Sequence, residues 1–255
     1  MILALTLGQL GCGLLLGSWL TPRHEAGDEF LRMIALLAAA FLLPLAAVGA
    51  PPAAWLLVPA AVLCGIAGVL FPRGRAPLAL VLLVPATTLA LLGISVTVLP
   101  FGRGTAGAGA EAGLLTLHSI TSAALLGTTI GGMLLGHWYL VNTGMPIAPL
   151  RRVAVAMGAA ALVKVPMLVA VFAMHGWPPT RLGWAMALFL PPGLFYFIRV
   201  LIGILGPLSL APMVWQTARL QATQSATGIL YAAVVLVLIG EMTANFLMAR
   251  TAFPF

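Results

Sequence analysis

Long runs of apolar residues recur along this chain and leave it few ways to fold. A helix needs about 20 apolar residues to cross the hydrocarbon core of a bilayer, where backbone polar groups are satisfied only in helices or closed barrels. Proline and glycine separate most of the runs. We therefore predict an all-α, polytopic integral membrane protein with eight transmembrane helices, at residues 2–20, 30–50, 54–71, 78–100, 113–141, 153–174, 182–205 and 226–248.

The composition excludes a soluble protein, because 62% of the 255 residues are hydrophobic and only 7% are charged. The arginines and lysines do not form a basic run, so nucleic acid is not an expected partner, whereas membrane lipid is. Cys12 and Cys64 both lie in apolar runs, which argues against a disulfide and against a thiolate metal site. The stretch 206–225 is too polar to span, and its second half is predicted to lie along the membrane surface as an amphipathic segment.

Arginine is unevenly distributed between the predicted loops. The loops after the first, third, fifth and seventh spans carry more arginines than the loops on the opposite side. Since cytoplasmic loops are enriched in Lys and Arg, and eight crossings bring both termini to one side, we expect both termini on the non-cytoplasmic side. The expected location is a bacterial-type inner membrane.

A shift of 119 positions aligns the start of the chain with its middle. Leu31-Arg32 then falls on Leu150-Arg151 without a gap. This register predicts an ancient duplication, with one four-helix repeat at 1–104 and a second at 105–255. The matched pairs in the first helix are Gly13 with Gly132, Leu15 with Leu134, Leu16 with Leu135, Gly17 with Gly136 and Trp19 with Trp138.

Ionisable residues gather in the second repeat. An ionisable side chain in hydrocarbon costs a few kcal/mol, so each one is a functional hypothesis. His137 aligns with Ser18 of the first repeat, which indicates that packing alone does not require the imidazole. The residues concerned are His118 and His137 in the predicted fifth span, Lys164 in the sixth, His175 just after it, Arg199 in the seventh and Glu241 in the eighth.

The main functional hypothesis is a membrane subunit of a respiratory or electron-transfer complex that binds quinone in its second bundle. A quinone head group needs hydrogen-bond partners and aromatic walls, and His137, Tyr139, Tyr196 and Arg199 are expected at one depth. A proton path would run through Lys164, Glu241, His118 and His175. Such a subunit is non-catalytic or quinone-reactive, and its redox partners are separate chains.

Several alternatives remain open. A transporter of small solutes or ions would fit two parallel repeats and a seventh helix interrupted at Pro191-Pro192-Gly193. A b-type haem anchor would need paired histidines, either His118 with His175 or His24 with His137. A lipid-modifying enzyme would need a carboxylate cluster, for which only the loop with Glu25, Asp28 and Glu29 is available.

The plainest alternative is a structural subunit. In that interpretation His137 faces water in an aromatic belt, and Lys164 and Glu241 form a structural ion pair. In helix count and in its division into two four-helix bundles, the chain resembles the quinol-interacting membrane subunits of the polysulfide-reductase type. The resemblance implies a fold only, since it includes no shared motif.

Overall fold

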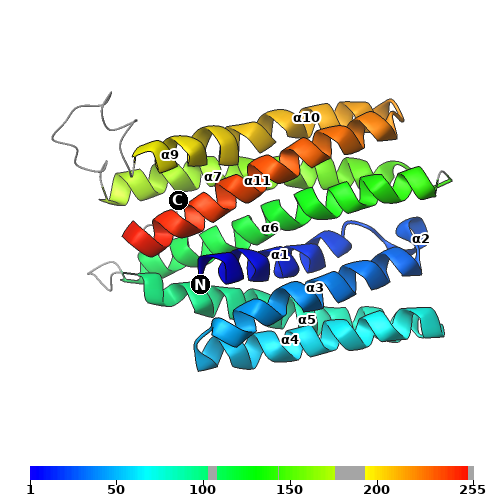
Figure 1. Cartoon of the computed structure of the whole chain (residues 1–255), viewed down its shortest axis with the longest axis horizontal. Helices are drawn as coiled ribbons and strands as arrows, with labels where there is room; N and C mark the ends of the chain where they lie inside the picture. The colour runs from blue at the N-terminus through cyan, green and yellow to red at the C-terminus, as the bar shows by residue number, and fades with distance from the viewer. Residues whose placement is uncertain (103–107, 143, 176–192, 252–255) are drawn as a thin grey trace.

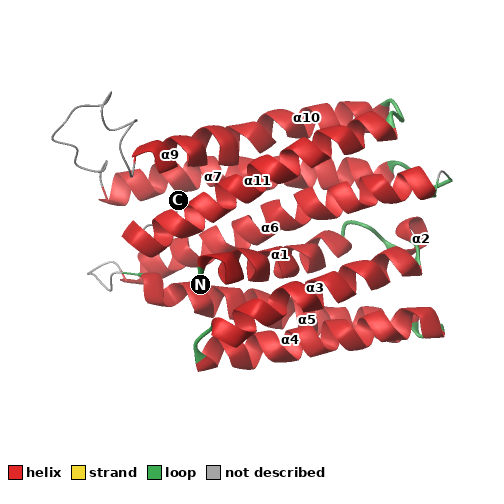
Figure 2. Ribbon diagram, viewed as in Figure 1, coloured by secondary structure: helices red, strands yellow, loops and turns green. Residues whose placement is uncertain are grey.

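The computed structural model describes residues 1–102, 108–142, 144–175 and 193–251, and every regular element in these ranges is a helix (Figure 2). The elements are α1 (Ile2–Ser18), α2 (Arg23–Ala26), α3 (Asp28–Val48), α4 (Pro51–Leu70), the 3₁₀ turn η1 (Phe71–Arg73), α5 (Ala76–Val98), the 3₁₀ turn η2 (Leu99–Phe101), α6 (Ala108–Val141), α7 (Ala148–His175), α9 (Gly193–Val200), the π-helical turn η3 (Leu201–Leu205), α10 (Gly206–Arg219) and α11 (Thr223–Thr251).

Seven helical segments in the described part are long and apolar enough to cross a membrane. This confirms the prediction of an all-α, multi-pass membrane protein. The first apolar helix, α1, has 17 residues and is shorter than these seven, although it packs against α3 and α6 inside the bundle (Figure 1). The eighth crossing therefore stays a prediction.

The long helices form two groups that meet at α1 and α6 (Figure 1). In one group α1, α3, α4 and α5 contact one another in chain order, and α5 returns to α1. In the other group α6, α7, α10 and α11 do the same, and α11 returns to α6. This neighbour order is what two four-helix repeats would produce, but it does not test common descent, so the internal repeat stays a prediction.

Two glycines let α1 and α6 approach closely. A Cβ atom on Gly13 would overlap the backbone of Ala123, and a Cβ atom on Gly127 would overlap the backbone of Gly13. Small residues allow such backbone contact between membrane helices, where packing rather than the hydrophobic effect drives association. The contact holds the two groups together along their central helices.

The position of the seventh span was predicted wrongly. The candidate span is Gly193–Arg219. The sequence predicted a span that ends at 205 and a stretch 206–225 that does not cross the membrane, with its second half on the surface; residues 182–192 lie outside the described part. Pro207 lies in the first turn of α10, just after the π-helical turn η3, which widens the backbone where the proline ring would otherwise clash. Ser209 and Thr217 donate to the carbonyls of Gly206 and Met213, which reduces their cost in hydrocarbon.

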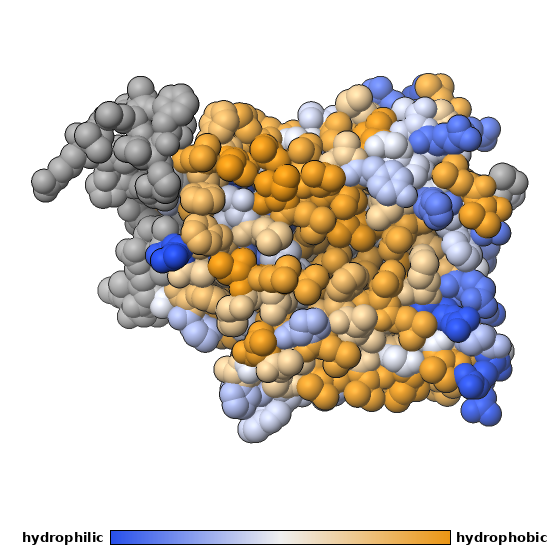
Figure 3. Space-filling model, viewed as in Figure 1, coloured by the Kyte–Doolittle hydropathy of each residue, from blue (hydrophilic) through white to orange (hydrophobic). Residues whose placement is uncertain are grey.

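Charged side chains gather at the end of the bundle that carries α2, beyond a broad apolar belt (Figure 3). The acidic residues of α2 and of the first turn of α3 each have a basic partner. Arg152 pairs with Glu25, Arg23 with Asp28 and Arg32 with Glu29. Within the described ranges no group of His, Cys, Asp and Glu could hold a metal ion. In the structure, the carboxylates of Glu25, Asp28 and Glu29 therefore serve as ion-pair partners.

Candidate functional site

A carboxylate lies between two cations in the interior of the second helix group. Glu241 accepts a hydrogen bond from Lys164 Nζ at 3.2 Å on one oxygen and from Arg199 Nη1 at 2.8 Å on the other. Lys164 also donates to Ser122 Oγ at 2.9 Å. The side chains of Lys164, Arg199 and Glu241 are at most 1% exposed. We call these three residues the charge triad.

The geometry of α9 and η3 brings Arg199 to the triad. Gly203 follows Arg199 by four residues, and Gly240 precedes Glu241, so both glycines lie next to the ion pair. A Cβ atom on Gly203 would lie 2.7 Å from Gly240 Cα, too close for any side chain at that position. The two backbones therefore touch where the guanidinium meets the carboxylate. Local π-helical turns are frequent at functional sites, and η3 begins two residues after Arg199.

His118 is buried beside the triad on α6, one turn before Ser122. It lies close enough to Lys164, Glu241 and Arg199 for their charges to act on its ring. The amide of Asn245 lies near the ring without a hydrogen bond of ordinary geometry. Neither ring nitrogen has a hydrogen-bond partner among the described residues, and the same holds for Nε and Nη2 of Arg199. Buried polar atoms without partners are uncommon and call for an explanation.

Helix α1 contributes a polar extension that the sequence analysis missed. Gln9 lies in the first helix group, yet its amide exchanges hydrogen bonds with Asn245 and also donates to Ser119 at 3.3 Å. Asn245 donates in addition to Thr6 Oγ1 at 2.9 Å. Since Asn245 follows Glu241 by one helical turn, these amides continue the polar interior from the triad. A lone glutamine in an apolar span was the available signal, because such a side chain needs a partner.

The triad lies near the middle of the second helix group. Lys164 follows the first residue of α7 by 16 positions, and Glu241 precedes the last residue of α11 by ten. At 1.5 Å per residue these separations are about 24 Å and about 15 Å. An apolar core of about 30 Å around the bundle would therefore enclose the triad. Two positive charges against one negative charge at such a depth are costly, even with good geometry.

The structure does not bring the four predicted quinone ligands together. Arg199 belongs to the triad near His118, and His137 lies 19 residues further along α6, about 28 Å away. His137 is exposed, whereas Tyr139 is buried and donates from its hydroxyl to the carbonyl of Pro146. Tyr196 packs near Val171 and Leu247, at the Arg199 end. The expected common depth was wrong because the candidate span with Arg199 continues to Arg219 instead of ending at 205.

The predicted proton-path residues are closer to one another. Lys164 and Glu241 are in direct contact and His118 is their neighbour, but His175 is the last residue of α7 and its side chain lies outside the described part. The haem ligand pair His118 and His175 is therefore untested. In the other pair, both His24 and His137 are exposed at the surface.

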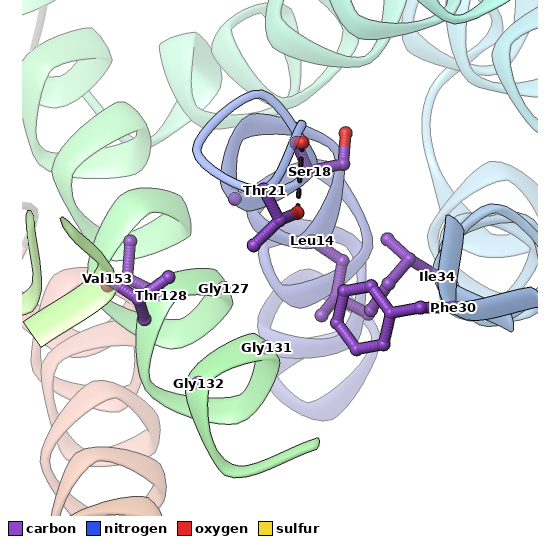
Figure 4. A pocket seen from close by; sticks show the side chains of 11 residues that line it. Leu14, Ser18, Thr21, Phe30, Ile34, Gly127, Thr128, Gly131, Gly132 and Val153 are labelled. Atoms are coloured by element: carbon purple, nitrogen blue, oxygen red, sulfur yellow. Dashed lines mark hydrogen bonds between the residues drawn. The ribbon is translucent and has the colours of Figure 1, made fainter. Parts of the chain in front are cut away.

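A small cavity lies between α1, α3, α6 and α7, away from the triad (Figure 4). Gly127, Gly131 and Gly132 form one wall, and Phe30 and Ile34 form the opposite wall. Its volume is about 10 Å³, close to the smallest that holds one water molecule. It is too small for a quinone head group.

Comparison of the chain with protein-family models, curated proteins and solved structures finds no match. What the site can do is therefore inferred from the chemistry of its own residues. The triad can hold a proton on Glu241 or Lys164, and the free donors of Arg199 can bind an acceptor oxygen.

Proposed function

We propose that the protein conducts protons through its second helical bundle, with Glu241, Lys164 and His118 as the groups that bind and release them. The observation that carries the proposal is the buried triad with its excess cation, together with the adjacent imidazole, which has no hydrogen-bond partner among the described residues. A purely structural ion pair needs one cation for its carboxylate. Intramembrane ionisable residues of this kind mark proton and ion routes.

The proposed step uses the contacts of the triad. A proton that reaches Glu241 neutralises its carboxylate and weakens the bond to Lys164 Nζ, which then keeps only its hydrogen bond to Ser122. The released ammonium can pass a proton to the free ring nitrogen of His118, which leaves a neutral amine that Glu241 reprotonates. Arg199 stays charged and holds Glu241 in place throughout.

Two histidines of α6 provide the test. In liposomes with a trapped pH indicator and a potassium gradient clamped by valinomycin, the wild-type protein should increase proton flux over protein-free vesicles. His118→Asn should abolish this increase, whereas His137→Asn should not change it, because His137 is exposed and far from the triad. Equal flux in both variants would refute the role of His118.

Quinone binding is the second candidate. It is favoured by Nε and Nη2 of Arg199, two buried donors without partners among the described residues, and by the aromatic rings close by in the chain. The rings of Phe195 and Phe246 are in contact, with centroids 4.9 Å apart and planes tilted by 45°, and Tyr196 lies in the same region. A quinone carbonyl oxygen could accept from the guanidinium. This proposal moves the quinone contact from His137 to the Arg199 end of the bundle.

Solvent extraction of the protein purified with native lipid tests the second candidate. Bound quinone should be present in the wild type and lost in Arg199→Met, and it should be retained in Arg73→Met, which changes an exposed arginine. Arg199→Met leaves Lys164 paired with Glu241, so the variant is expected to fold. Absence of quinone from the wild type, or equal amounts in both variants, would reject quinone binding. Membership in a respiratory complex of a bacterial-type inner membrane belongs to the same proposal.

A further inference from the structure

A groove opens between α7 and α10 at the charged end of the bundle, far from the triad. Its volume is about 480 Å³, and its walls include Leu20, Arg151, Val155, Ala156 and Trp215. Arg151 lies in the first turn of α7, and Trp215 lies in the last two turns of α10. The groove therefore combines the start of one long helix with the end of its neighbour.

Two arginines, Arg151 in the groove wall and Arg219 beside Trp215, have no carboxylate partner in the described part of the chain. The guanidinium carbons of Arg151 and Arg219 lie 5.4 Å and 5.6 Å from the centroid of the Trp215 ring. Arg152 differs from them, since it pairs with Glu25 and donates to the carbonyl of Leu20 at 2.9 Å. Nε of Arg151 is buried and has no hydrogen-bond partner among the described residues. The amino-terminal end of α7, which carries the positive end of the helix dipole, adds to the positive charge of these two arginines.

The wall below the arginines is apolar. Val155 follows Arg151 by one turn and is 59% exposed. Leu162 and Val169 follow Val155 at intervals of seven residues and are also exposed, so they continue one face of α7. This face belongs to the candidate span Ala148–Val171. A ligand of this groove thus meets cations at the membrane edge and an apolar face directly beneath them.

We propose that this groove binds the phosphate of an anionic phospholipid, with its acyl chains along Val155 and Leu162. Charge complementarity selects the anion, because Arg151 and Arg219 offer donors that no carboxylate of the described residues neutralises. The apolar wall selects a lipid over free phosphate. Basic sites between transmembrane helices bind anionic lipid head groups in this way. The proposed ligand carries one phosphodiester group, as phosphatidylglycerol does.

The test compares two pairs of arginines at the same end of the bundle. The full-length protein is exchanged into nanodiscs of phosphatidylcholine, titrated with phosphatidylglycerol, re-extracted in mild detergent and weighed by native mass spectrometry. The wild type should retain phosphatidylglycerol, and each arginine removed in Arg151→Gln/Arg219→Gln should weaken retention about tenfold. The matched control Arg73→Gln/Arg75→Gln changes two exposed arginines outside the groove and should retain the lipid like the wild type.

Three results would overturn the proposal. Equal loss in both double variants would indicate a general charge effect rather than a site. Retention of phosphatidylcholine as strong as that of phosphatidylglycerol would remove the role of the two guanidinium groups. Displacement of the lipid by millimolar inorganic phosphate alone would show an anion site without the lipid-binding wall. The folded state of every variant is checked by its thermal unfolding in detergent, so that a loss through unfolding is recognised.

Discussion

Asn245 Nδ2 donates a hydrogen bond to Gln9 Oε1 at 2.8 Å, and Gln9 Nε2 donates back to Asn245 Oδ1 at 3.4 Å. The two amides belong to α11 and α1, and both are fully buried. The pair therefore joins the two helix groups through their interiors, one turn away from Glu241. The polar interior of the protein extends beyond the second helix group.

Breaking this amide pair should destabilise the protein. Gln9→Leu or Asn245→Leu leaves one buried amide without its main partner, at a cost of about 1–2 kcal/mol in the free energy of unfolding. The double variant should cost less than the sum of the two, because neither amide is then left unpaired. Thermal unfolding in detergent, monitored by circular dichroism, measures the stability of the two single variants and of the double variant. Fully additive costs would show that the two amides are energetically independent.

The contact between α1 and α6 gives a second prediction. Gly127→Ala should force the two helices apart, because the added methyl group would overlap the backbone of Gly13. Gly131→Ala, one turn along the same helix, should be tolerated, since its nearest neighbour would be Leu14 Cδ2 at 3.7 Å. The melting temperature and the monodispersity of each variant measure the difference. Equal behaviour of the two variants would contradict the close approach of these helices.

Unequal charge in the triad leads to a third prediction. Glu241→Gln leaves Lys164 and Arg199 without their carboxylate and should cost about 3–5 kcal/mol of stability. Lys164→Met instead leaves one cation for one carboxylate, so its free energy of unfolding should equal or exceed that of the wild type. Chemical unfolding of the two variants in the same detergent provides the comparison. If Lys164→Met were destabilised as much as Glu241→Gln, the excess cation would be a structural requirement.

The sequence was sufficient for most of the helices. In seven of the eight predicted spans the predicted range and the observed helix overlap closely, because each helix consists mostly of one uninterrupted run of apolar residues. The end of the seventh was wrong because the stretch 206–225 was judged too polar to cross the membrane. In the structure Pro207 follows a π-helical turn, and Ser209 and Thr217 bond to their own helix.

The candidate site was predicted in part. Lys164 and Glu241 stood out because ionisable groups in an apolar span are costly, and the structure joins them. Arg199 was placed at the wrong depth, since its depth depended on the misplaced seventh span. Gln9 was missed because a neutral amide carries no formal charge that would mark it as costly in an apolar span. Its partner Asn245 lies 236 residues away, a distance that no local pattern reveals.

Topology gives a fourth prediction. Both termini are expected on the non-cytoplasmic side, and α1 begins at the end of the bundle where α11 ends (Figure 1). Cys12 and Cys64 are buried, so a cysteine introduced at an exposed site should be labelled selectively by a membrane-impermeant maleimide. In intact spheroplasts Arg250→Cys should react and Arg75→Cys should not. The reverse pattern would invert the orientation, and reaction of both would contradict an odd number of crossings between them.

Proton flux through Lys164→Met tests the central claim most directly. The claim is that the excess cation of the triad serves conduction and not stability. The wild type and Lys164→Met are reconstituted at equal amounts, and valinomycin-driven proton flux is recorded with a trapped pH indicator, with Arg73→Met as the control. The account predicts that Lys164→Met keeps wild-type stability and loses the flux, while Arg73→Met keeps both. Wild-type flux in a folded Lys164→Met variant would contradict it.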